Sequence, residues 1–597
     1  MSDLPTYLLQ LLSFDSQHPL LFTQIHFWVF FLLVFAGFSF IVTRRWRLTV
    51  RNAYLFFVSL FFYYKTSGLF VLLLVFSTLL GWTLGIYMDK WKVESGKRKA
   101  LMIIGVTLNL LMLGFFKYAY FFTDIFNATF GTEYSIAIKI LLPVGISFFT
   151  FQNISYIVDV YKRKIAHVST ILDFGFYTSF FPQLVAGPIL RADQCVPQLY
   201  KPFFLGRRQF GIAVFWILNG LIKKLVLSDY LAVNFVDRVF ENPLLYTPFE
   251  NFSALMLYSL QVYADFSGYT DIAIGEAMLM GFYLPTNFNS PYKAQNPTDF
   301  WRRWHMSLSR WLRDYLYIPL GGNRSAGWLS YSLLALILAI ASFRLHNLWF
   351  ALTAVAVMVA IGLLYLLRPS HRRTLGTNVN NMDTMLLGGL WHGASFNFIT
   401  WGGLNGLGIL VHKWWSKRTW RTRLVTLGVT TALLWLLRYT THAPLFNMLS
   451  FIALVCLIGY SILSLTTNHC TLTTVWSTLL TFVFISFTRL FFRSGSNLDP
   501  AEANEVAWRT ASQMVHQIGS QWNLAQVPDI VGHYWAPFLL FVLGMAVHWL
   551  PVRFKRRYRL WFAQMPLWLM VLTVVATVFV VYQFITADLQ PFIYFQF

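Results

Sequence analysis

The sequence predicts an all-α, polytopic integral membrane protein. Of its 597 residues, 57% are hydrophobic and only 12% are charged, whereas soluble domains carry about 25% charged residues. The mean hydropathy is +0.56. Aromatic side chains make up 19% of the chain, which suits a protein whose rings line the interfaces of a bilayer. This composition excludes a water-soluble globule, a disulfide-rich secreted scaffold and a disordered chain.

The membrane elements are predicted from apolar stretches, because a spanning helix needs about 20 mostly apolar residues. Such stretches, one of them short, lie at 21–42, 52–64, 69–88, 100–122, 136–158, 209–228, 251–275, 328–344, 347–367, 384–411, 423–438, 445–465, 471–492, 534–550 and 565–587. With re-entrant segments included, we expect about 13 to 16 membrane elements. No repeat or low-complexity linker divides the chain, so residues 1–597 form one predicted membrane domain.

Two further segments are apolar but interrupted by proline and glycine. Residues 172–190 contain Gly187 and Pro188, and residues 141–162 contain Pro143 together with several polar side chains. Irregular backbone at membrane depth is tolerated only where protein or a watery cavity covers it. We therefore expect 172–190 to be re-entrant, and Pro143, Gly187 and Pro188 to line a cavity or tunnel.

The distribution of charge predicts the orientation of the chain. Lys and Arg number 46 against 24 Asp and Glu, a formal net charge of +22. The basic residues form short clusters between apolar spans, which is typical of cytoplasmic loops and not of nucleic-acid binding. The clusters predicted to be cytoplasmic lie at 44–51, 89–99, 161–164, 413–423 and 553–559. The acidic segments 124–135 and 497–533 are predicted to lie outside, as are both chain ends.

One stretch does not fit this topology. The basic clusters at 368–373 and 413–423 would both be cytoplasmic, with the single apolar stretch 384–411 between them. Either this stretch enters the membrane and returns, or one of the clusters lies outside. A glycine-rich segment that enters and returns is a candidate site.

Residues 287–324 form a basic and aromatic segment after a turn-rich start. At helical spacing Trp301 and His305 share one face, and arginines lie around the others. One interpretation is an interfacial amphipathic helix whose arginines contact lipid phosphates. The other is a cytoplasmic entrance whose arginines attract an anionic, phosphate-bearing substrate while His305 faces inward. The candidate substrate-binding residues here are Trp301, Arg302, Arg303, Trp304, Ser309 and Arg310.

A second histidine, His392, lies in the glycine-rich segment 385–406. Small residues let helices approach closely in a bilayer, so a packing helix with one buried histidine is one interpretation. An ionisable side chain at membrane depth is costly, however, and marks a functional site. Neutral imidazole can also accept a proton from a hydroxyl group. We therefore take His392 as a candidate base, and Trp391 and Asn397 as candidate substrate contacts.

Asp265 and Asp271 lie in an apolar run six residues apart, so they do not share a helical face. We expect them to pair with the arginine-rich segment or to cap broken backbone, and not to form a catalytic carboxylate pair. The chain contains no GxSxG, P-loop or HExxH motif, so nothing supports a serine hydrolase, an NTP-driven pump or a zincin. The three cysteines form no CxxC pair, and no metal site is predicted.

At these segments the sequence resembles the membrane-bound O-acyltransferase (MBOAT) family, and most of all its bacterial branch that modifies alginate and teichoic acids. The resemblance is carried by LLPVGISFFTFQ (141–152), FPQLVAGPI (181–189), YADFSGYTDIAIG (263–275), FWRRWHMSLSRWLRDYLYIPLGGNR (300–324) and LLGGLWHGASFNFITWGGLNG (386–406). Its core spans 141–411, and the tail segments 482–495 and 591–597 are similar to the same branch. The pair of WHMSLS and WHG motifs is highly specific.

The resemblance implies a ring of helices around a central tunnel that joins a cytoplasmic and an extracytoplasmic funnel. The family's two functional histidines correspond to His305 and His392; His392 would be the base and His305 an essential residue on the donor side. An acyl group, foremost acetyl from acetyl-CoA or another thioester, would pass to a hydroxyl group of an extracytoplasmic polysaccharide such as alginate. The resemblance also implies the bacterial inner membrane, a periplasmic SGNH-type transferase or esterase as partner, and no permanently bound cofactor.

The spacing of the two histidines departs from the family pattern. His305 and His392 are 87 residues apart, which is longer than the bacterial branch leads us to expect. The excess at 325–370 predicts an additional helical hairpin, which preserves the topology because it crosses the membrane twice. Residues 423–597 would supply the C-terminal helices and an extracytoplasmic loop at 497–533.

Three alternatives stay open. The acyl group could be D-alanyl from a carrier-protein thioester, which requires a protein docking surface on the cytoplasmic face. The chain could instead transport a polysaccharide or a lipid-linked glycan, or act as a non-catalytic scaffold of a synthase complex. A transporter does not need both histidines for turnover, so separate substitutions of His305 and His392 by alanine distinguish it from the enzyme.

Overall fold

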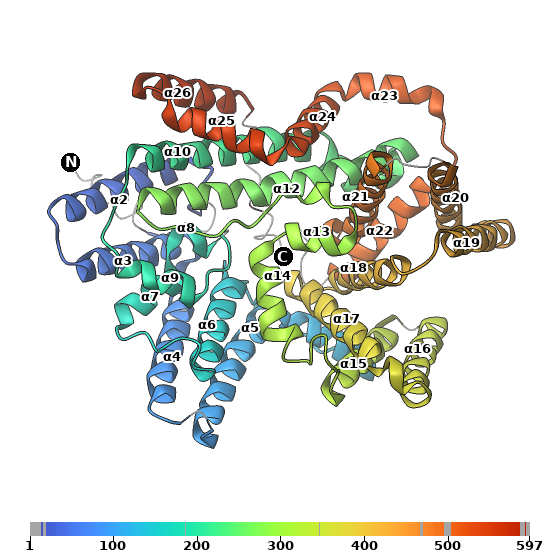
Figure 1. The fold of residues 1–597 in the computed structure, drawn as a ribbon, viewed down its shortest axis with the longest axis horizontal. Coiled ribbons are helices and arrows are strands. Elements are labelled where there is room, and N and C mark those ends of the chain that lie inside the picture. Colours follow the sequence, from blue (N-terminus) through green and yellow to red (C-terminus); the bar gives the residue numbers. More distant parts are fainter. Residues whose placement is uncertain are drawn as a thin grey trace.

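The computed structural model describes residues 13–15, 19–92, 94–185, 187–345, 347–465, 470–494, 503–584 and 592. Within this part of the chain the secondary structure is helical and contains no strand (Figure 1). Ten described helices are long and apolar enough to cross a membrane, or up to eleven if the bent pair Leu524–His533 and Trp535–Trp549 forms one span. The predicted class, an all-α polytopic membrane protein, is confirmed.

The number of long apolar helices is lower than the expected total of about 13 to 16 membrane elements, because several of those elements are short or polar. Helix α6 has 16 residues, of which 14 are buried. Helix α12 has 32 residues, but it carries Asp265, Asp271 and Glu276 within its apolar run. These two helices are enclosed by other helices of the protein, which is why their sequences differ from that of a lipid-facing span.

The N-terminal helices form the left part of the molecule in Figure 1. Their bounds are α2 Ile25–Thr43, α3 Leu48–Ser67, α4 Val71–Asp89, α5 Gly96–Phe130, α6 Ile146–Tyr161, α7 Ile171–Ser179, α8 Phe181–Leu184 and α9 Ala192–Leu199. The segment 172–190 that we predicted to be re-entrant comprises α7 except its first residue, the short helix α8 and irregular backbone, and its described residues from 173 onward are buried. Proline and glycine thus interrupt the helix where expected.

The middle of the molecule is crossed by α12, with α10 alongside it (Figure 1). The bounds here are α10 Arg207–Leu221, two π-helical turns at Ile222–Asp229 and Ala232–Val236, α11 Asp237–Glu241 and α12 Pro248–Leu279. A capping box of Thr247 and Glu250 starts α12. This long helix separates the N-terminal helices from those that follow it.

The acidic residues of α12 have partners other than those we predicted. The Lys223 Nζ lies 2.6 Å from an Asp271 oxygen, and the Lys224 Nζ lies 2.6 Å from Asp265 and 2.7 Å from Asp229. These ion pairs are with lysines, whereas we expected the arginines of 300–324. Two consecutive lysines on the π-helical turn after α10 thus face α12. The short distances matter because only close contact offsets the desolvation of both charges in a buried ion pair.

The helices from 297 to 415 surround the candidate site. Their bounds are α13 Pro297–Arg303, α14 Met306–Leu312, a π-helical turn at Arg313–Tyr317, α15 Trp328–Leu345, α16 Leu348–Leu367, α17 Arg372–His392 and α18 Phe396–Trp415. Helices α15 and α16 occupy the stretch 325–370, where we expected an additional helical hairpin. Both are candidate membrane spans in which few residues are buried.

Helices α17 and α18 form a tightly packed antiparallel hairpin. A Cβ atom added to Gly389 would lie 2.2 Å from the Phe398 carbonyl oxygen, and one added to Gly402 would lie 2.2 Å from that of Met385. Only glycine permits this approach of the two backbones. The two helices run in opposite directions, so the basic clusters 368–373 and 413–423 lie at the same end of the hairpin. This is the arrangement expected if the stretch between the clusters enters the membrane and returns.

The remaining helices lie at the right and along the top of Figure 1. Their bounds are α19 Trp420–Thr441, α20 Pro444–Leu465, α21 Cys470–Ser494, α22 Ala503–Ile518, α23 Val527–His533, α24 Trp535–Trp549, α25 Val552–Gln564 and α26 Leu567–Phe584. The expected loop at 497–533 therefore contains α22 and α23. Helix α22 forms because Ala507, Ala511, Met514 and Ile518 recur at helical spacing and are buried.

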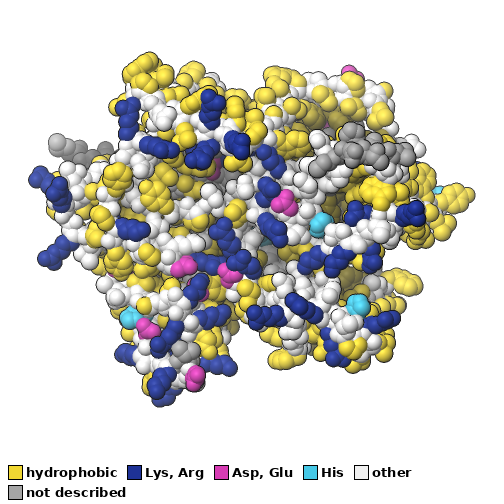
Figure 2. Space-filling view, viewed as in Figure 1, with side chains coloured by type: hydrophobic (Ala, Val, Ile, Leu, Met, Phe, Trp, Pro, Cys, Tyr) yellow, Lys and Arg dark blue, Asp and Glu magenta, His cyan; other side chains and the backbone are white. Residues whose placement is uncertain are grey.

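The surface agrees with the composition. Figure 2 shows that Lys and Arg far outnumber Asp and Glu on the face viewed, and that hydrophobic side chains cover much of the rest. Exposed apolar residues at this density are typical of a surface that faces lipid.

Candidate active site

His305 lies at a break between two short helices and not inside one continuous helix. Helix α13 ends at Arg303 and α14 begins at Met306. The backbone of His305 is left-handed, with φ +41°, a conformation that costs a non-glycine residue about 1 kcal/mol or more. The predicted shared face of Trp301 and His305 is therefore wrong. Figure 1 shows α13 and α14 near the centre of the molecule.

The side chain of Asn287 holds this break in place. Its Oδ1 accepts hydrogen bonds from the Ser307 backbone N–H at 3.1 Å and the Ser307 hydroxyl at 2.9 Å, and lies 3.2 Å from His305 Nδ1. Because Oδ1 accepts from a backbone N–H, it must also be the acceptor from the imidazole. His305 Nδ1 is thus the donor, and in neutral His305 the lone pair is on Nε2. The imidazole is fully buried and lies edge-on to Phe266.

His392 is the last residue of α17, at the closed end of the α17–α18 hairpin. Its side chain is 3% exposed. Three aromatic rings surround the imidazole, with centroids 4.9 Å (Trp391), 5.0 Å (Trp401) and 5.3 Å (Phe492) from its own. A Cβ atom added to Gly393, the residue after His392, would lie 2.0 Å from the Phe398 ring. The glycine of the WHG motif therefore leaves the space that this ring occupies.

The Trp391 ring lies close to both histidines. Its centroid is 6.0 Å from that of His305 and 4.9 Å from that of His392. On another side, Phe151 of α6 stacks on Trp311 with a centroid distance of 3.7 Å and lies 5.4 Å from Trp391. Three of the segments singled out in the sequence, 141–162, 287–324 and 385–406, thus meet around one tryptophan.

The irregular segment 181–191 reaches the same place. The backbone N–H of Ile189 donates to the Ser307 hydroxyl at 3.0 Å, and Arg191 forms an ion pair with Asp314 at 2.8 Å. Burial raises the pKa of the Asp314 carboxyl, but hydrogen bonds from Arg313 and Arg191 lower it further, so that this pKa lies below its ordinary value. The segment is therefore fixed to both ends of α14.

Two residues of α5 that the sequence did not single out hold the end of α17. The Lys117 Nζ donates to the carbonyl oxygens of Trp391 at 2.7 Å and His392 at 3.2 Å, and the Tyr118 hydroxyl donates to that of Leu390 at 2.8 Å. The last carbonyls of a helix have no partner within the helix, and a cation there is favourable. The signal was a lysine within an otherwise apolar span.

The predicted substrate-binding arginines are not gathered around His305. Arg302 and Arg310 are exposed, and Arg303 forms an ion pair with Asp299 at 2.9 Å. A different arginine is buried nearby: Arg489 of α21 lies 4.2 Å from the Trp304 ring centroid and donates to the Ser259 carbonyl oxygen at 3.1 Å. Such a cation over an aromatic face fixes the position of Trp304.

Three other predicted contacts hold helices together. The Ser309 hydroxyl donates to the Trp301 carbonyl oxygen at 3.1 Å. The Trp301 indole N–H donates to Asn405 at 3.3 Å, and the Asn397 amide donates to Ser494 at 3.0 Å. These side chains connect α13 and α14, α13 and α18, and α18 and α21.

The candidate tunnel residues are all buried. Pro143 accepts a hydrogen bond from the Ile146 backbone N–H just before α6. The Gly187 backbone N–H donates to Gln183, and a Cβ atom on Gly187 would lie 2.4 Å from the Gln183 Cα. Pro188 follows directly and precedes Ile189, which contacts Ser307. Gly187 and Pro188 thus shape irregular backbone close to α14, whereas Pro143 lies next to Val144, which contacts Tyr63 and Ser67 of α3.

The geometry defines a polytopic membrane protein in which two buried histidines at helix breaks lie close to one tryptophan. Residues 161–382 match the family model described as MBOAT, membrane-bound O-acyltransferase family. The matched range contains His305 and ends ten residues before His392. Together with the relatives described next, this match shows that the chain belongs to the membrane-bound O-acyltransferase family, a class of acyl-transferring enzymes. The resemblance noted in the sequence is confirmed.

The chain is similar to bacterial proteins whose names refer to O-acetylation. It is 35% identical to the probable alginate O-acetylase AlgI of Pseudomonas aeruginosa over 400 residues, covering 66% of each chain. It is 35% identical to the protein of the same name in Pseudomonas putida over 400 residues, 66% of this chain and 71% of the relative. It is 34% identical to the peptidoglycan O-acetyltransferase of Helicobacter pylori over 387 residues, 60% of this chain and 64% of the relative.

Proposed function

We propose that this protein transfers an acetyl group from a cytoplasmic thioester to a hydroxyl group of an extracytoplasmic polysaccharide. The names of its relatives, which refer to O-acetylation of alginate and of peptidoglycan, support the acyl group and the class of acceptor. The basic clusters at one end of the α17–α18 hairpin support a location in the inner membrane with these loops in the cytoplasm. In this topology both chain ends are extracytoplasmic.

The observation that carries the proposal is the surroundings of His392. Its imidazole is buried, ringed by Trp391, Trp401 and Phe492, and located where the α17–α18 hairpin turns. A neutral imidazole in a water-poor environment can take a proton from a substrate hydroxyl. The same environment protects a thioester from hydrolysis.

In the proposed reaction His392 acts first as base and then as acid. Its imidazole removes the proton of the acceptor hydroxyl, whose oxygen attacks the thioester carbonyl carbon. The carbon–oxygen bond forms, the carbon–sulfur bond breaks, and the leaving thiolate takes the proton from His392. The reaction thus consumes one hydroxyl group and one thioester and yields one ester and one thiol.

His305 supports the donor side of this reaction. Its Nδ1–H is held by Asn287, so the lone pair of the neutral imidazole is on Nε2. The His305 ring lies 6.0 Å from the Trp391 ring, which in turn lies 4.9 Å from the His392 ring. We assign Trp391 to the wall of the path along which the acyl group passes from one histidine to the other.

The proposed donor is acetyl-CoA or another acetyl thioester, bound as a substrate and not as a permanent cofactor. The exposed side chains Arg302 and Arg310, one on each of the two helices that flank His305, suit the phosphates of such a donor. The proposed acceptor is either the polysaccharide itself or a serine of a periplasmic SGNH-type transferase. That partner would complete the transfer outside the membrane.

The test is the acetyl content of surface polysaccharide from cells that carry wild-type protein, His392→Ala or His305→Ala at equal membrane abundance. We expect either substitution to lower polysaccharide acetylation by a factor of about 100 or more, with total exported polymer unchanged. His26→Ala, at an exposed histidine of α2, is the matched control and should leave acetylation intact.

The other outcomes each reject the proposal in a different way. Acetylation that persists in His392→Ala removes the assignment of the base. Loss of polymer export in place of loss of acetyl groups indicates a transporter. Loss of D-alanyl esters with acetyl esters unchanged indicates the other acyl group.

A further inference from the structure

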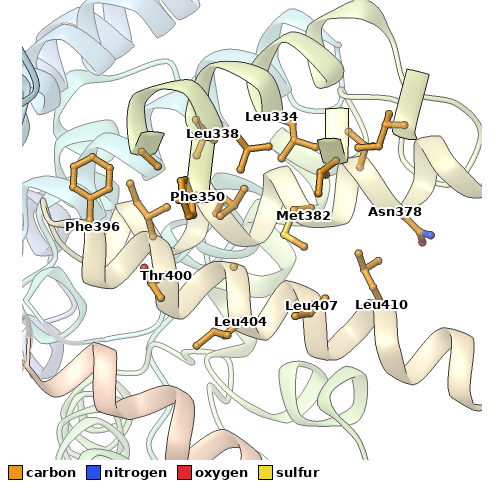
Figure 3. Close-up of a pocket in the computed structure, with 18 of the residues that line it drawn as sticks. Leu334, Leu338, Phe350, Asn378, Met382, Phe396, Thr400, Leu404, Leu407 and Leu410 are labelled. Atoms are coloured by element: carbon orange, nitrogen blue, oxygen red, sulfur yellow. The ribbon is translucent and has the colours of Figure 1, made fainter. Parts of the chain in front are cut away.

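A long apolar groove lies between α15 and α16 on one side and α17 and α18 on the other. Figure 3 shows side chains from both sides pointing into it. Its volume is about 760 Å³, and Asn378, Thr400 and Trp508 are its only polar side chains among the described residues. The apolar lining includes Leu334, Leu338, Phe350, Met382, Leu404 and Leu407. A groove of this composition offers almost no hydrogen-bonding partner to an occupant.

The length of the groove matches the hydrocarbon thickness of one bilayer leaflet. Along α17 it runs from Leu375 to Leu386, and the eleven residue-to-residue steps between them rise about 16 Å in a helix. One leaflet contributes about 15 Å of hydrocarbon. Because α15 and α16 are candidate membrane spans in which few residues are buried, we infer that the groove lies at membrane depth and borders the lipid.

The two ends of the groove differ in charge. Near Leu375, α17 begins with Arg372 and Arg373, and Arg368 precedes them; all three are exposed. Arg372 and Arg373 donate only to backbone carbonyl oxygens, those of Tyr365 and Asn323. In the part of the chain that the structure describes, no carboxylate pairs with any of the three arginines, so their charge is available to an anion.

The figures place these features together. In Figure 3 the Asn378 amide lies at one end of the groove beside Leu410, and Phe396 lies at the other end. Figure 2 shows basic side chains over the junction of α16 and α17. The polar and charged end is therefore the end nearest the arginines, and the apolar end is next to Phe396, four residues beyond His392.

We propose that this groove binds one acyl chain of an anionic phospholipid, with the phosphate of its headgroup held by Arg368, Arg372 and Arg373. A hydrocarbon chain needs no hydrogen bond, whereas an extended peptide in the groove would leave its backbone polar groups unsatisfied. The combination of a leaflet-long apolar channel and an uncompensated basic end matches a lipid in both of its parts. Free phosphate would use the arginines alone and leave the groove empty.

The bound lipid supports the helices that form the active site without taking part in the chemistry. Leu386 and Phe396 line the groove, and they lie six residues before and four residues after His392. A chain in the groove fills the space between the α15–α16 hairpin and α17. This gives the α15–α16 hairpin a role: it encloses a lipid against the helix that ends at His392.

The test is lipid retention by the purified full-length protein. Wild-type protein in mild detergent is given equal amounts of phosphatidylglycerol and phosphatidylcholine with identical chains, and bound lipid is counted by native mass spectrometry. We expect the wild-type protein to retain one phosphatidylglycerol molecule in preference to phosphatidylcholine. Each basic side chain near a headgroup favours an anionic lipid by about fivefold, so Arg372→Gln with Arg373→Gln should reduce this preference by about 25-fold.

A second variant tests the apolar part. Leu404→Trp with Leu338→Trp fills the groove and should abolish retention of either lipid. Leu433→Trp on the exposed face of α19 is the matched control, since Leu433 is 55% exposed, and it should retain lipid as wild type does. Equal retention of the two lipids by wild type, or retention unchanged in the groove variant, overturns the proposal.

A measurement on wild-type protein does not depend on the stability of any variant. Phosphatidylglycerol with a photoreactive group in the middle of one chain is incorporated into vesicles that contain the protein. We expect cross-links in peptides from 334–345 and 396–410, and none above background in 425–439 of α19. Cross-links spread evenly over all lipid-facing helices, or a second copy of the chain captured at the groove, contradict a specific lipid site. Because neither readout measures acetylation, failure here leaves the proposed reaction untouched.

Discussion

The two histidine-bearing helix breaks are held in place in opposite ways. The break at His305 is fixed locally: Asn287, eighteen residues earlier, binds the imidazole and the start of α14, and the His305 backbone is left-handed. The break at His392 is fixed from afar, by Lys117 and Tyr118 of α5 on the last carbonyl groups of α17. The first break therefore fixes a tautomer, and the second fixes the position of a helix end.

Lys117→Met is the change expected to affect the second break most. It removes two charge-assisted hydrogen bonds, to the carbonyl oxygens of Trp391 and His392. A hydrogen bond that involves a charged group is worth about 1.5–3 kcal/mol. If that energy holds the catalytic geometry, kcat should fall about 10- to 100-fold with KM for the thioester little changed. The measurement is acetyl transfer at several thioester concentrations by protein in vesicles.

Two further variants sharpen this result. Lys117→Arg keeps a cation and its donors, so it should recover part of the lost rate. Lys139→Met, at an exposed lysine outside the helices, should have no effect. An increase in KM without a decrease in kcat would place Lys117 in substrate binding and not in positioning.

Asn287→Leu should have a smaller effect on rate and a larger one on stability. It leaves the Ser307 N–H, the Ser307 hydroxyl and His305 Nδ1 without their common acceptor, and an unsatisfied buried polar group costs about 1–3 kcal/mol. We expect a lower unfolding temperature in detergent and a rate reduced by about tenfold.

Asn287→Asp retains acceptor oxygens and should recover most of the unfolding temperature. If Asn287→Leu instead lowers the rate more than Lys117→Met does, the local break at His305 is the one that limits the reaction. The comparison between the two breaks would then be reversed.

Tyr118→Phe is expected to have the smallest effect. It removes one neutral hydrogen bond to the Leu390 carbonyl oxygen, and such bonds between membrane helices are worth about 0.6 kcal/mol on average. The rate should therefore fall by no more than about threefold, measured in the same transfer assay. A loss as large as that of Lys117→Met would show that the hydroxyl and not the ammonium holds the helix end.

The sequence was sufficient for the fold class and for the segments of the site. Hydropathy identified the lipid-facing helices, and the WHMSLS and WHG motifs located both histidines. Hydropathy did not separate buried helices such as α6 and α12 from true spans, because both kinds are apolar. It also could not reveal that His305 has a left-handed backbone, since that conformation depends on the hydrogen bonds of Asn287.

Long-range contacts explain the other differences. No local pattern pairs Lys117 with Trp391, which is 274 residues away, or places Asp265 beside Lys224. The arginines of 300–324 were expected at the site because of their proximity in sequence to His305. In the structure their helices place Arg302 and Arg310 at the surface, and Arg489 supplies the buried cation near Trp304.

The contact between Lys117 and the end of α17 also sets the order in which the protein can be assembled. Lys117 is synthesised 275 residues before His392, and at about 5–20 residues per second this interval lasts about 14 to 55 seconds. During that time α5 is already in the membrane while its ammonium group has not met the carbonyl groups that it will bind. The active site is thus completed late in biosynthesis, and a ribosome that stalls before residue 392 leaves a membrane-inserted chain with an unpartnered lysine, a feature by which quality control could recognise it.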